Sequence, residues 1–247
     1  MNKYQREPPH LPKDCHHCPV RESTVCSAMR EDQLALLEAF KTCDRILPVR
    51  AHLYRTGERP HEIYNLLSGW VTLYRILPSG KRQVLEIAAP GAFLGYQARL
   101  GDPMLHSAEC SSDVAVCVFP RRTFPVLLEQ HPAIRRKLLE LIADDVVRGQ
   151  DQLTNMGGRF GLERVAYFLL QLHLHQHRRR DASDENSLNI PLTQEMIGDA
   201  LGITVVHINR ILRDLRERRL VSLHRGTLHM LDLEGLRRLS EESQRVP

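Results

Sequence analysis

Between Asp44 and about Phe124, short apolar runs alternate with turn residues. Runs such as Trp70–Arg75 and Val84–Ile87 are strand-like. Pairs such as Ser79-Gly80 and Pro90-Gly91 interrupt the chain at intervals of roughly ten residues. Regularly spaced short strands with such turns predict a β-barrel or β-sandwich domain.

A long helical pattern follows, from about residue 125 to residue 156. Its apolar positions are alternately three and four residues apart, which is the a/d spacing of a coiled-coil seam. They are Leu139, Ile142, Val146, Gly149, Leu153 and Met156. We expect this helix to pair with a second copy, although a helix packed on its own domain would show the same pattern. Gly157-Gly158 predicts a break, and Arg178 to Asn189 reads as a polar loop.

Residues 190–247 read as a last compact unit that begins with two short helices. Thr193 is a cap for the first helix, and Gly202 allows a tight turn after it. Thr204 is a cap for the second helix, which is expected to bury Val205, Ile208 and Leu212. The turn-rich stretch Val221–Leu231 reads as a hairpin, so the unit is predicted to be a winged helix-turn-helix.

The second of these helices leaves residue types exposed that are suited to reading DNA. In a helix-turn-helix it enters the major groove, where Arg pairs with guanine, Asn with adenine, and Val contacts the thymine methyl group. The candidate DNA-contacting residues are Thr193, Gln194, Thr204, Val206, His207, Asn209, Arg210 and Arg213. The alternative interpretation is a helical hairpin with a solvated basic face.

The composition excludes few classes of protein. The 247 residues carry 34 Lys and Arg against 30 Asp and Glu, an excess too small to indicate nucleic-acid binding by itself. No stretch approaches the roughly 20 apolar residues of a membrane span, and the polar N-terminus has no signal-peptide pattern, so we expect a cytoplasmic location. No nucleophile elbow, P-loop or dinucleotide fingerprint is present, which argues against an enzyme.

Half of the six cysteines lie near the N-terminus, with C-x2-C-x7-C spacing: Cys15, Cys18 and Cys26. Residues 1–30 contain few apolar positions and read as an irregular arm. Cytoplasmic thiols stay reduced, and thiolates bind soft metals and iron–sulfur clusters. We therefore expect these cysteines to hold a metal or a cluster.

Taken in order, these parts resemble the CRP/FNR superfamily of bacterial transcription regulators. The resemblance rests on Leu201–Val205 followed by Ile208-Asn209-Arg210, and on Leu162–Ala166. It implies an α+β fold with a cysteine-rich arm (1–30), a cyclic-nucleotide-binding-like, cupin-type β-roll sensor domain (31–125), a long dimerisation helix (126–157) and a winged helix-turn-helix (158–247). It also implies a homodimer that binds near-palindromic promoter DNA and recruits or blocks RNA polymerase, with activator as the leading expectation.

Two stretches indicate which branch of the family the chain resembles. Cyclic-nucleotide-binding members carry Gly-Glu and Arg-Ser/Thr pairs, whereas this chain has Gly95-Tyr96-Gln97 and His106-Ser107. Val116–Pro120 instead resembles the segment of the FNR branch that carries a distant fourth cysteine. The resemblance thus implies a [4Fe–4S] cluster on Cys15, Cys18, Cys26 and Cys117. In such regulators oxygen breaks down the cluster, which weakens the dimer and DNA binding.

Several alternatives stay open. Cys110 competes with Cys117 for the fourth position. The same thiols would satisfy zinc, with His16 or His17 in place of one of them. A thiol-based switch, a haem-sensing regulator, a site with no cofactor and a ligand-binding module that does not bind DNA are further readings. At the position where oxygen-responsive members read a base with glutamate, this chain has Val206, which predicts a different preferred base.

Overall fold

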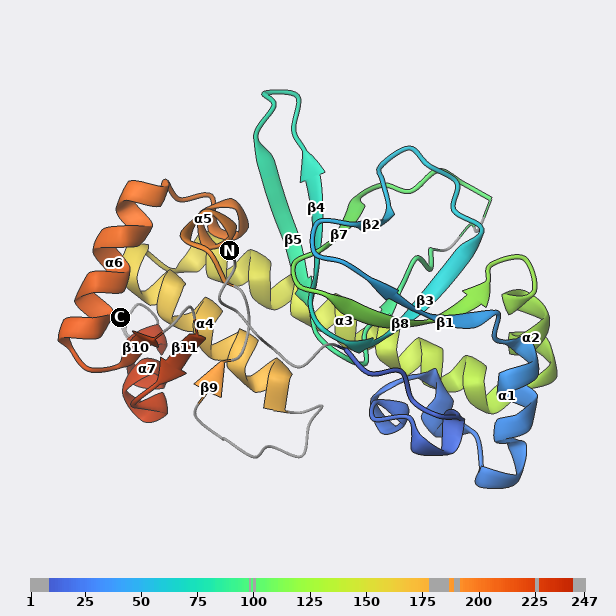
Figure 1. The fold of residues 1–247 in the computed structure, drawn as a ribbon. Coiled ribbons are helices and arrows are strands. Elements are labelled where there is room, and N and C mark those ends of the chain that lie inside the picture. The colour runs from blue at the N-terminus through green and yellow to red at the C-terminus, as the bar shows by residue number, and fades with distance from the viewer. Residues whose placement is uncertain are drawn as a thin grey trace. The chain divides into compact units, whose positions relative to one another are not determined.

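The computed structural model describes residues 9–97, 99, 101–177, 187–188, 192–224 and 227–241. It divides into two compact units. The N-terminal unit comprises residues 1–73 and 88–141, and the C-terminal unit comprises residues 74–87 and 142–247. Figure 1 colours the chain in sequence order.

Two four-stranded sheets form the β-roll. The first has the order β1 (Cys43–Leu47), β8 (Val114–Pro120), β3 (Glu62–Ser68), β6 (Phe93–Leu94). The second has the order β2 (His52–Tyr54), β7 (Ser107–Cys110), β4 (Val71–Ile76), β5 (Arg82–Ala88). Both contribute buried side chains to one apolar core, so the predicted β domain is confirmed.

Strand β8 lies between β1 and β3 and pairs antiparallel with both. Its side chains alternate between two apolar clusters, as the period of a strand requires. Val114, Val116 and Val118 face the core of the roll. Ala115, Cys117 and Phe119 face a second cluster that includes Val20 and Cys18 of the N-terminal arm. The arm therefore covers the outer face of this sheet.

The arm is more ordered than its sequence suggests. Residues Cys15–His17, Arg21–Ser23, Val25–Ala28 and Glu31–Gln33 form 3-10 turns, which lead into α1 (Leu34–Phe40). The side chains of Asp14 and Thr24 accept hydrogen bonds from the first turns that follow them. Val20, Val25 and Met29 are buried. The expectation of an irregular arm was wrong because turns of three or four residues leave no periodic pattern.

The long helical pattern contains two helices. The first is α2 (Phe124–Gln130), and the second is α3 (Pro132–Gly158). Proline at the start of α3 has no N–H to donate, which is no loss in the first turn of a helix. Gly157 and Gly158 belong to the last turn of α3, so the predicted break falls later, before Gly161 with φ +38°.

The C-terminal unit is a winged helix-turn-helix. Its elements are α4 (Gly161–His177), β9 (Ser187–Leu188), α5 (Gln194–Leu201), α6 (Val205–Glu217), β10 (Val221–His224), β11 (Thr227–Met230) and α7 (Leu233–Glu241). The strands pair antiparallel in the order β10-β11-β9, which confirms the expected hairpin. The expected loop from Arg178 to Asn189 lies largely outside the described residues, but Ser187 and Leu188 pair with β11. A strand of two residues is too short to leave a pattern in the sequence, because it forms only by pairing with its neighbour.

No helix in the described part of the chain is long and apolar enough to cross a membrane.

The turn of the helix-turn-helix predicts a steric test. A Cβ atom on Gly198 would lie 2.6 Å from the backbone oxygen of Ile203, too close for any side chain. We expect Gly198→Ala to lower the free energy of unfolding of the C-terminal unit by about 1–3 kcal/mol, measured by denaturant unfolding of the full chain. Gly157→Ala is the matched control, because its Cβ meets nothing within 4 Å. Equal stability of the two variants would contradict the close contact.

Candidate functional sites

The helix-turn-helix is held by two threonine caps and a left-handed glycine. The Thr193 hydroxyl accepts from the Met196 N–H at 3.1 Å, and that of Thr204 accepts from the His207 N–H at 3.4 Å. Gly202 ends α5 with φ +68°, a region that favours glycine. All three residues have the local structure that the sequence predicted.

The buried face of α6 differs from the expected one by one residue. Ile208 and Leu212 are buried as predicted, together with Ile211 and Leu215. Val205 is 42% exposed, so its expected burial was wrong. It is the first residue of the helix, where the preceding turn that would help to cover a side chain is missing.

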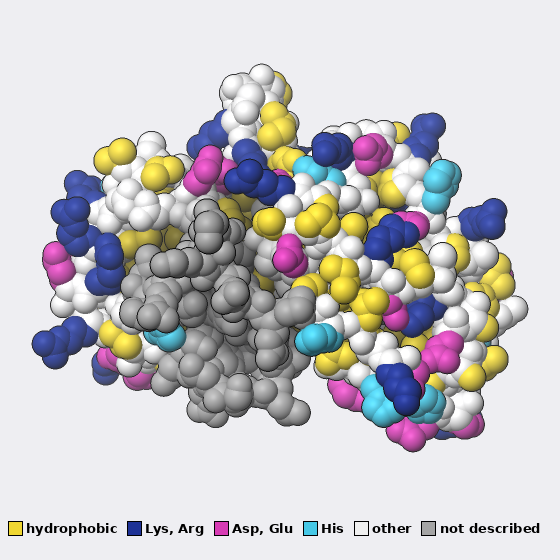
Figure 2. Space-filling view, in the orientation of Figure 1, with side chains coloured by type: hydrophobic (Ala, Val, Ile, Leu, Met, Phe, Trp, Pro, Cys, Tyr) yellow, Lys and Arg dark blue, Asp and Glu magenta, His cyan; other side chains and the backbone are white. Residues whose placement is uncertain are grey.

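The opposite face of α6 carries most of the candidate DNA-contacting side chains. Val206 is 81% exposed, and Asn209, Arg210 and Arg213 are exposed as well. In Figure 2, Lys and Arg side chains gather over this helix. Arginine, asparagine and an apolar side chain on one helix face have the chemistry to contact base edges and phosphates.

His207 differs from the other candidates on this face. Its Nδ1 lies 3.0 Å from Nη2 of Arg210, and its Nε2 lies near the start of α4, 3.6 Å from where a Cβ of Gly161 would stand. The ring is half-buried beside a shallow groove lined by Arg210 and Arg213. In this arrangement the His207 ring contacts Arg210 and helps to orient its guanidinium, and Nδ1 is not free to contact a base.

The carboxyl end of α5 is held by glutamine side chains from two other elements of the C-terminal unit. Gln83 of β5 donates to the Asp199 carbonyl at 2.8 Å, and Gln152 of α3 donates to the Ala200 carbonyl at 3.2 Å. The last carbonyls of a helix have no partner within it, so these bonds satisfy them. The sequence carried no signal for this arrangement.

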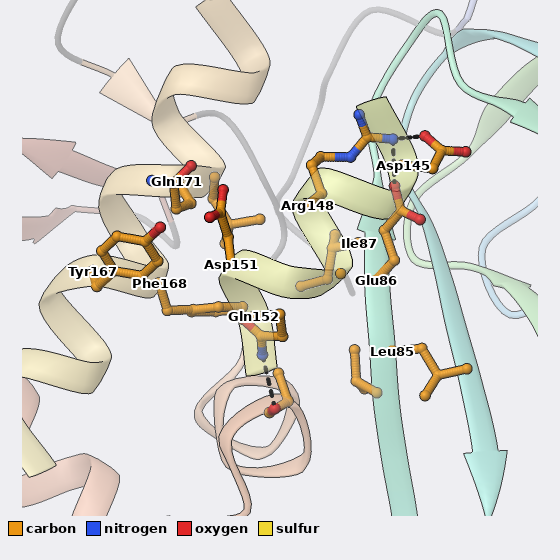
Figure 3. A pocket seen from close by; sticks show the side chains of 14 residues that line it. Leu85, Glu86, Ile87, Asp145, Arg148, Asp151, Gln152, Tyr167, Phe168 and Gln171 are labelled. Carbon is orange, nitrogen blue, oxygen red and sulfur yellow. Dashed lines mark hydrogen bonds and ion pairs between the residues drawn. The ribbon is translucent and has the colours of Figure 1, made fainter. Parts of the chain in front are cut away.

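A cavity of about 130 Å³ lies beside these contacts (Figure 3). Its wall includes an ion-paired arginine, Arg148. The Arg148 guanidinium contacts Asp145, and its Nη2 lies 3.7 Å from Glu86 Oε1. Tyr167 and Gln171 of α4, with Asp151 and Gln152 of α3, are further polar residues of the lining. The cavity and the glutamine contacts connect β5, α3 and α4 with the first helix of the helix-turn-helix.

The four cysteines named by the family resemblance lie on the arm and on β8, which pack together in the N-terminal unit. Cys117 is directly opposite Asn65 in the strand pairing, and Asn65 Nδ2 donates to Cys26 Sγ at 3.6 Å. Cys18 packs against the same apolar cluster as Cys117. The backbone N–H of Cys15 donates to Glu38 Oε1 at 2.8 Å, which ties the first turn to α1.

Burial dominates the acidity of these thiols. It raises the pKa of Cys15 to about 12 and that of Cys26 to about 11, and it raises the pKa of Cys18 and Cys117 as well. After burial, the charge of Asp44 raises the pKa of Cys117 most, and the charges of Cys26 and Cys15 raise this pKa further. Lys41 is a nearby cation that lowers the pKa of Cys15 and Cys117.

The other two cysteines lie elsewhere in the same unit. Cys110 is buried in the core of the β-roll, and the charges that affect it are those of Glu109 and Asp113 rather than of other cysteines. Cys43 lies on β1 and accepts a long contact from Arg45 Nη2 at 3.9 Å. Cys110 thus faces the core of the roll, whereas Cys117 faces the cluster on the outer side of its sheet.

The neighbouring histidines do not join the cysteines. His17 Nδ1 lies 2.6 Å from Asp14 Oδ1, and this pair is largely exposed. Among the described residues, no three His, Cys, Asp or Glu side chains converge closely enough to hold a single metal ion.

Comparison with known proteins agrees with both units. Residues 163–239 match the Crp-like helix-turn-helix domain, and residues 45–131 match the cyclic nucleotide-binding domain. The nitrogen fixation regulation protein FixK of Bradyrhizobium diazoefficiens is 30% identical over 225 residues, which cover 88% of this chain and 90% of FixK. The transcriptional activator protein FnrL of Cereibacter sphaeroides is 24% identical over 237 residues, which cover 95% of this chain and 94% of FnrL.

A solved structure extends the agreement to the fold. The structure of FixK2 from Bradyrhizobium japonicum superposes with a TM-score of 0.71 at 23% identity, covering 80% of this chain and 96% of FixK2. The match to a regulator at 30% identity spans both the β-roll and the winged helix-turn-helix. The chain therefore belongs to the CRP/FNR superfamily of DNA-binding transcription regulators.

Proposed function

We propose that this regulator is controlled by oxygen or redox state through a [4Fe–4S] cluster bound by Cys15, Cys18, Cys26 and Cys117. One observation carries the proposal. Strand β8 alternates between two clusters, and Cys117 falls on the face that the cysteine-bearing arm covers. Cys110 falls in the core of the roll, away from the arm. The proposal therefore takes Cys117 as the fourth ligand.

The surroundings of the four thiols suit such a group. When bound, a [4Fe–4S] cluster would supply sensitivity to oxygen and to redox state. Asn65 is 2% exposed and already donates to Cys26 Sγ, and hydrogen bonds to sulfur tune clusters of this kind. Lys41, which is ion-paired with Asp44 at 2.8 Å, would offset part of the negative charge of four thiolates. Metal binding would also supply the driving force to deprotonate thiols that burial keeps neutral.

The alternative of a thiol-only switch fits this site less well. A reactive cysteine needs a thiolate at neutral pH and access to oxidant. Here burial raises the pKa of Cys15, Cys26 and Cys117, which favours the neutral thiol.

We propose that the DNA-binding form is a homodimer paired along α3. Three members of the a/d ladder present large apolar side chains to solvent: Leu139 is 62% exposed, Val146 55% and Leu153 71%. A Cβ on Gly149 would meet nothing within 4 Å, so close approach of a second helix at this point is sterically open. Two recognition helices related by a dyad would read a near-palindromic promoter site, from which the dimer recruits or blocks RNA polymerase.

Iron and acid-labile sulfide analysis of the anaerobically purified chain tests the cofactor. We expect about four of each per chain, because four cysteines satisfy one cubane cluster. Cys117→Ala should lose both, with Cys117→Ser as a second variant in case alanine disturbs the fold. Cys110→Ala is the matched control and should keep them, because it is buried away from the arm. Zinc in place of iron, or loss of iron on Cys110→Ala alone, would contradict the ligand set.

Two neighbouring valines test the dimer seam. Val146 and Val147 are 55% and 54% exposed, but only Val146 lies on the ladder. We expect Val146→Asp to shift the anaerobic protein from dimer to monomer in light scattering, because it places a charge on an apolar interface. Val147→Asp should remain dimeric. Equal dissociation of both variants would place the interface elsewhere on the helix.

Selection of DNA sites tests the recognition helix. Val206 is exposed at the position where oxygen-responsive members of the family read a base with glutamate, so we expect the selected half-site to differ at one base from theirs. Arg210→Ala should weaken specific binding roughly 10- to 100-fold, the effect of losing one bidentate base contact. Arg136→Ala, an exposed arginine on α3, should leave affinity nearly unchanged. Recovery of the ordinary half-site would rule out the altered base preference.

A further inference from the structure

Arg121 follows directly after strand β8 and is only 3% exposed. Its backbone N–H donates to the His61 carbonyl at 2.8 Å, which fixes the start of its side chain. The next residue, Arg122, is exposed. Two adjacent arginines therefore have opposite environments, and the burial of Arg121 is the unusual one.

The guanidinium of Arg121 lacks the partners that a buried cation needs. Its Nη1 donates to the Pro60 carbonyl at 3.4 Å and lies 3.6 Å from Met104 Sδ, both weak contacts. Its Nε and Nη2 have no hydrogen-bond partner in the described part of the chain. None of the ion pairs among these residues includes Arg121.

A buried arginine without a counter-charge is costly. The guanidinium stays protonated in proteins, so it cannot escape the cost of desolvation by losing its charge. Buried charges are normally paired because their hydration is lost. The buried cation therefore destabilises the folded chain, and a bound anion would offset this cost.

A pair of polar side chains lies in the same part of the β-roll as this cation. Tyr54, on β2, belongs to the same buried cluster as Met104, which Arg121 Nη1 contacts. The Tyr54 hydroxyl lies 3.0 Å from His106 Nε2, and their rings meet edge to face with centroids 5.5 Å apart. His106 directly precedes β7.

We infer that Arg121, with the hydroxyl of Tyr54, forms an anion-binding site in the β-roll for a small carboxylate or oxyanion. Two oxygens of such a ligand match the two unpartnered nitrogens, Nε and Nη2, which lie on one edge of the guanidinium. His106 is a positioning residue that orients the Tyr54 hydroxyl. The site would give the regulator a second input besides its cysteines, and it does not depend on a cluster being present.

The competing account is that Arg121 serves packing alone. Its alkyl stem fills space beside Met104, and the Pro60 contact would then be its only polar requirement. This account expects no ligand and expects an apolar replacement of similar length to be tolerated. It therefore differs from the anion site in its response to added anions.

Thermal unfolding of the full chain in matched ionic strength separates the two accounts. The probes are sodium acetate, sodium sulfate and sodium phosphate, each compared with sodium chloride, and isothermal titration follows any that acts. We expect at least one probe to raise Tm saturably, by roughly 5 °C far above its Kd. A response to acetate assigns a carboxylate, and a response to sulfate or phosphate assigns an oxyanion.

The variants decide whether the response belongs to Arg121. Arg121→Met should abolish the saturable shift, and Arg121→Lys, which keeps the charge but not the two-pronged geometry, should weaken it at least tenfold in Kd. Arg122→Met is the matched control and should respond like the unmodified chain. If no probe acts saturably on the unmodified chain, or if Arg121→Met responds as strongly, the anion site is wrong.

Discussion

The two-sided burial of strand β8 is the constraint on which the N-terminal unit depends. Its seven residues are almost entirely apolar, and it pairs with a neighbour on each edge. A strand buried on both faces cannot shift by one residue without exchanging every side chain between the two clusters. That register fixes Cys117 on the arm side and leaves Val116 and Val118 in the core of the roll.

The same strand explains why the two proposed sites lie close together in sequence. Cys117 and Arg121 are four residues apart, yet the first faces the arm and the second is buried beyond the end of the strand, beside Met104. The sheet supplies a rigid frame, and the less regular segments around it supply the ligands. Packing of Val20 and Cys18 against the sheet keeps the arm of short turns in a defined position.

In the C-terminal unit, the recognition helix depends on short-range interactions that can be predicted from the sequence. Thr193 and Thr204 cap their helices, and Gly202 adopts the left-handed conformation between them. These features involve residues no more than four positions apart, so local chemistry was enough to predict them. The exposure of Val206 can also be predicted from the sequence, because it follows from the helical period.

The features that the sequence did not indicate all involve partners distant in the chain. Gln83 and Gln152 bind the end of α5 across 116 and 48 residues, and nothing about a lone glutamine marks it for that role. The strand register and the packing of the roll also set the different environments of Cys110 and Cys117. The same packing buries Arg121 and leaves Arg122 exposed.

The sequence by itself determined the order of the domains, the caps and turn of the DNA-reading helices, and the family, because these follow from periodicity and contacts within a few residues. Only the tertiary structure decided which cysteine meets the arm and which cation lies buried, because burial and facing direction arise from strands that meet across the sheet.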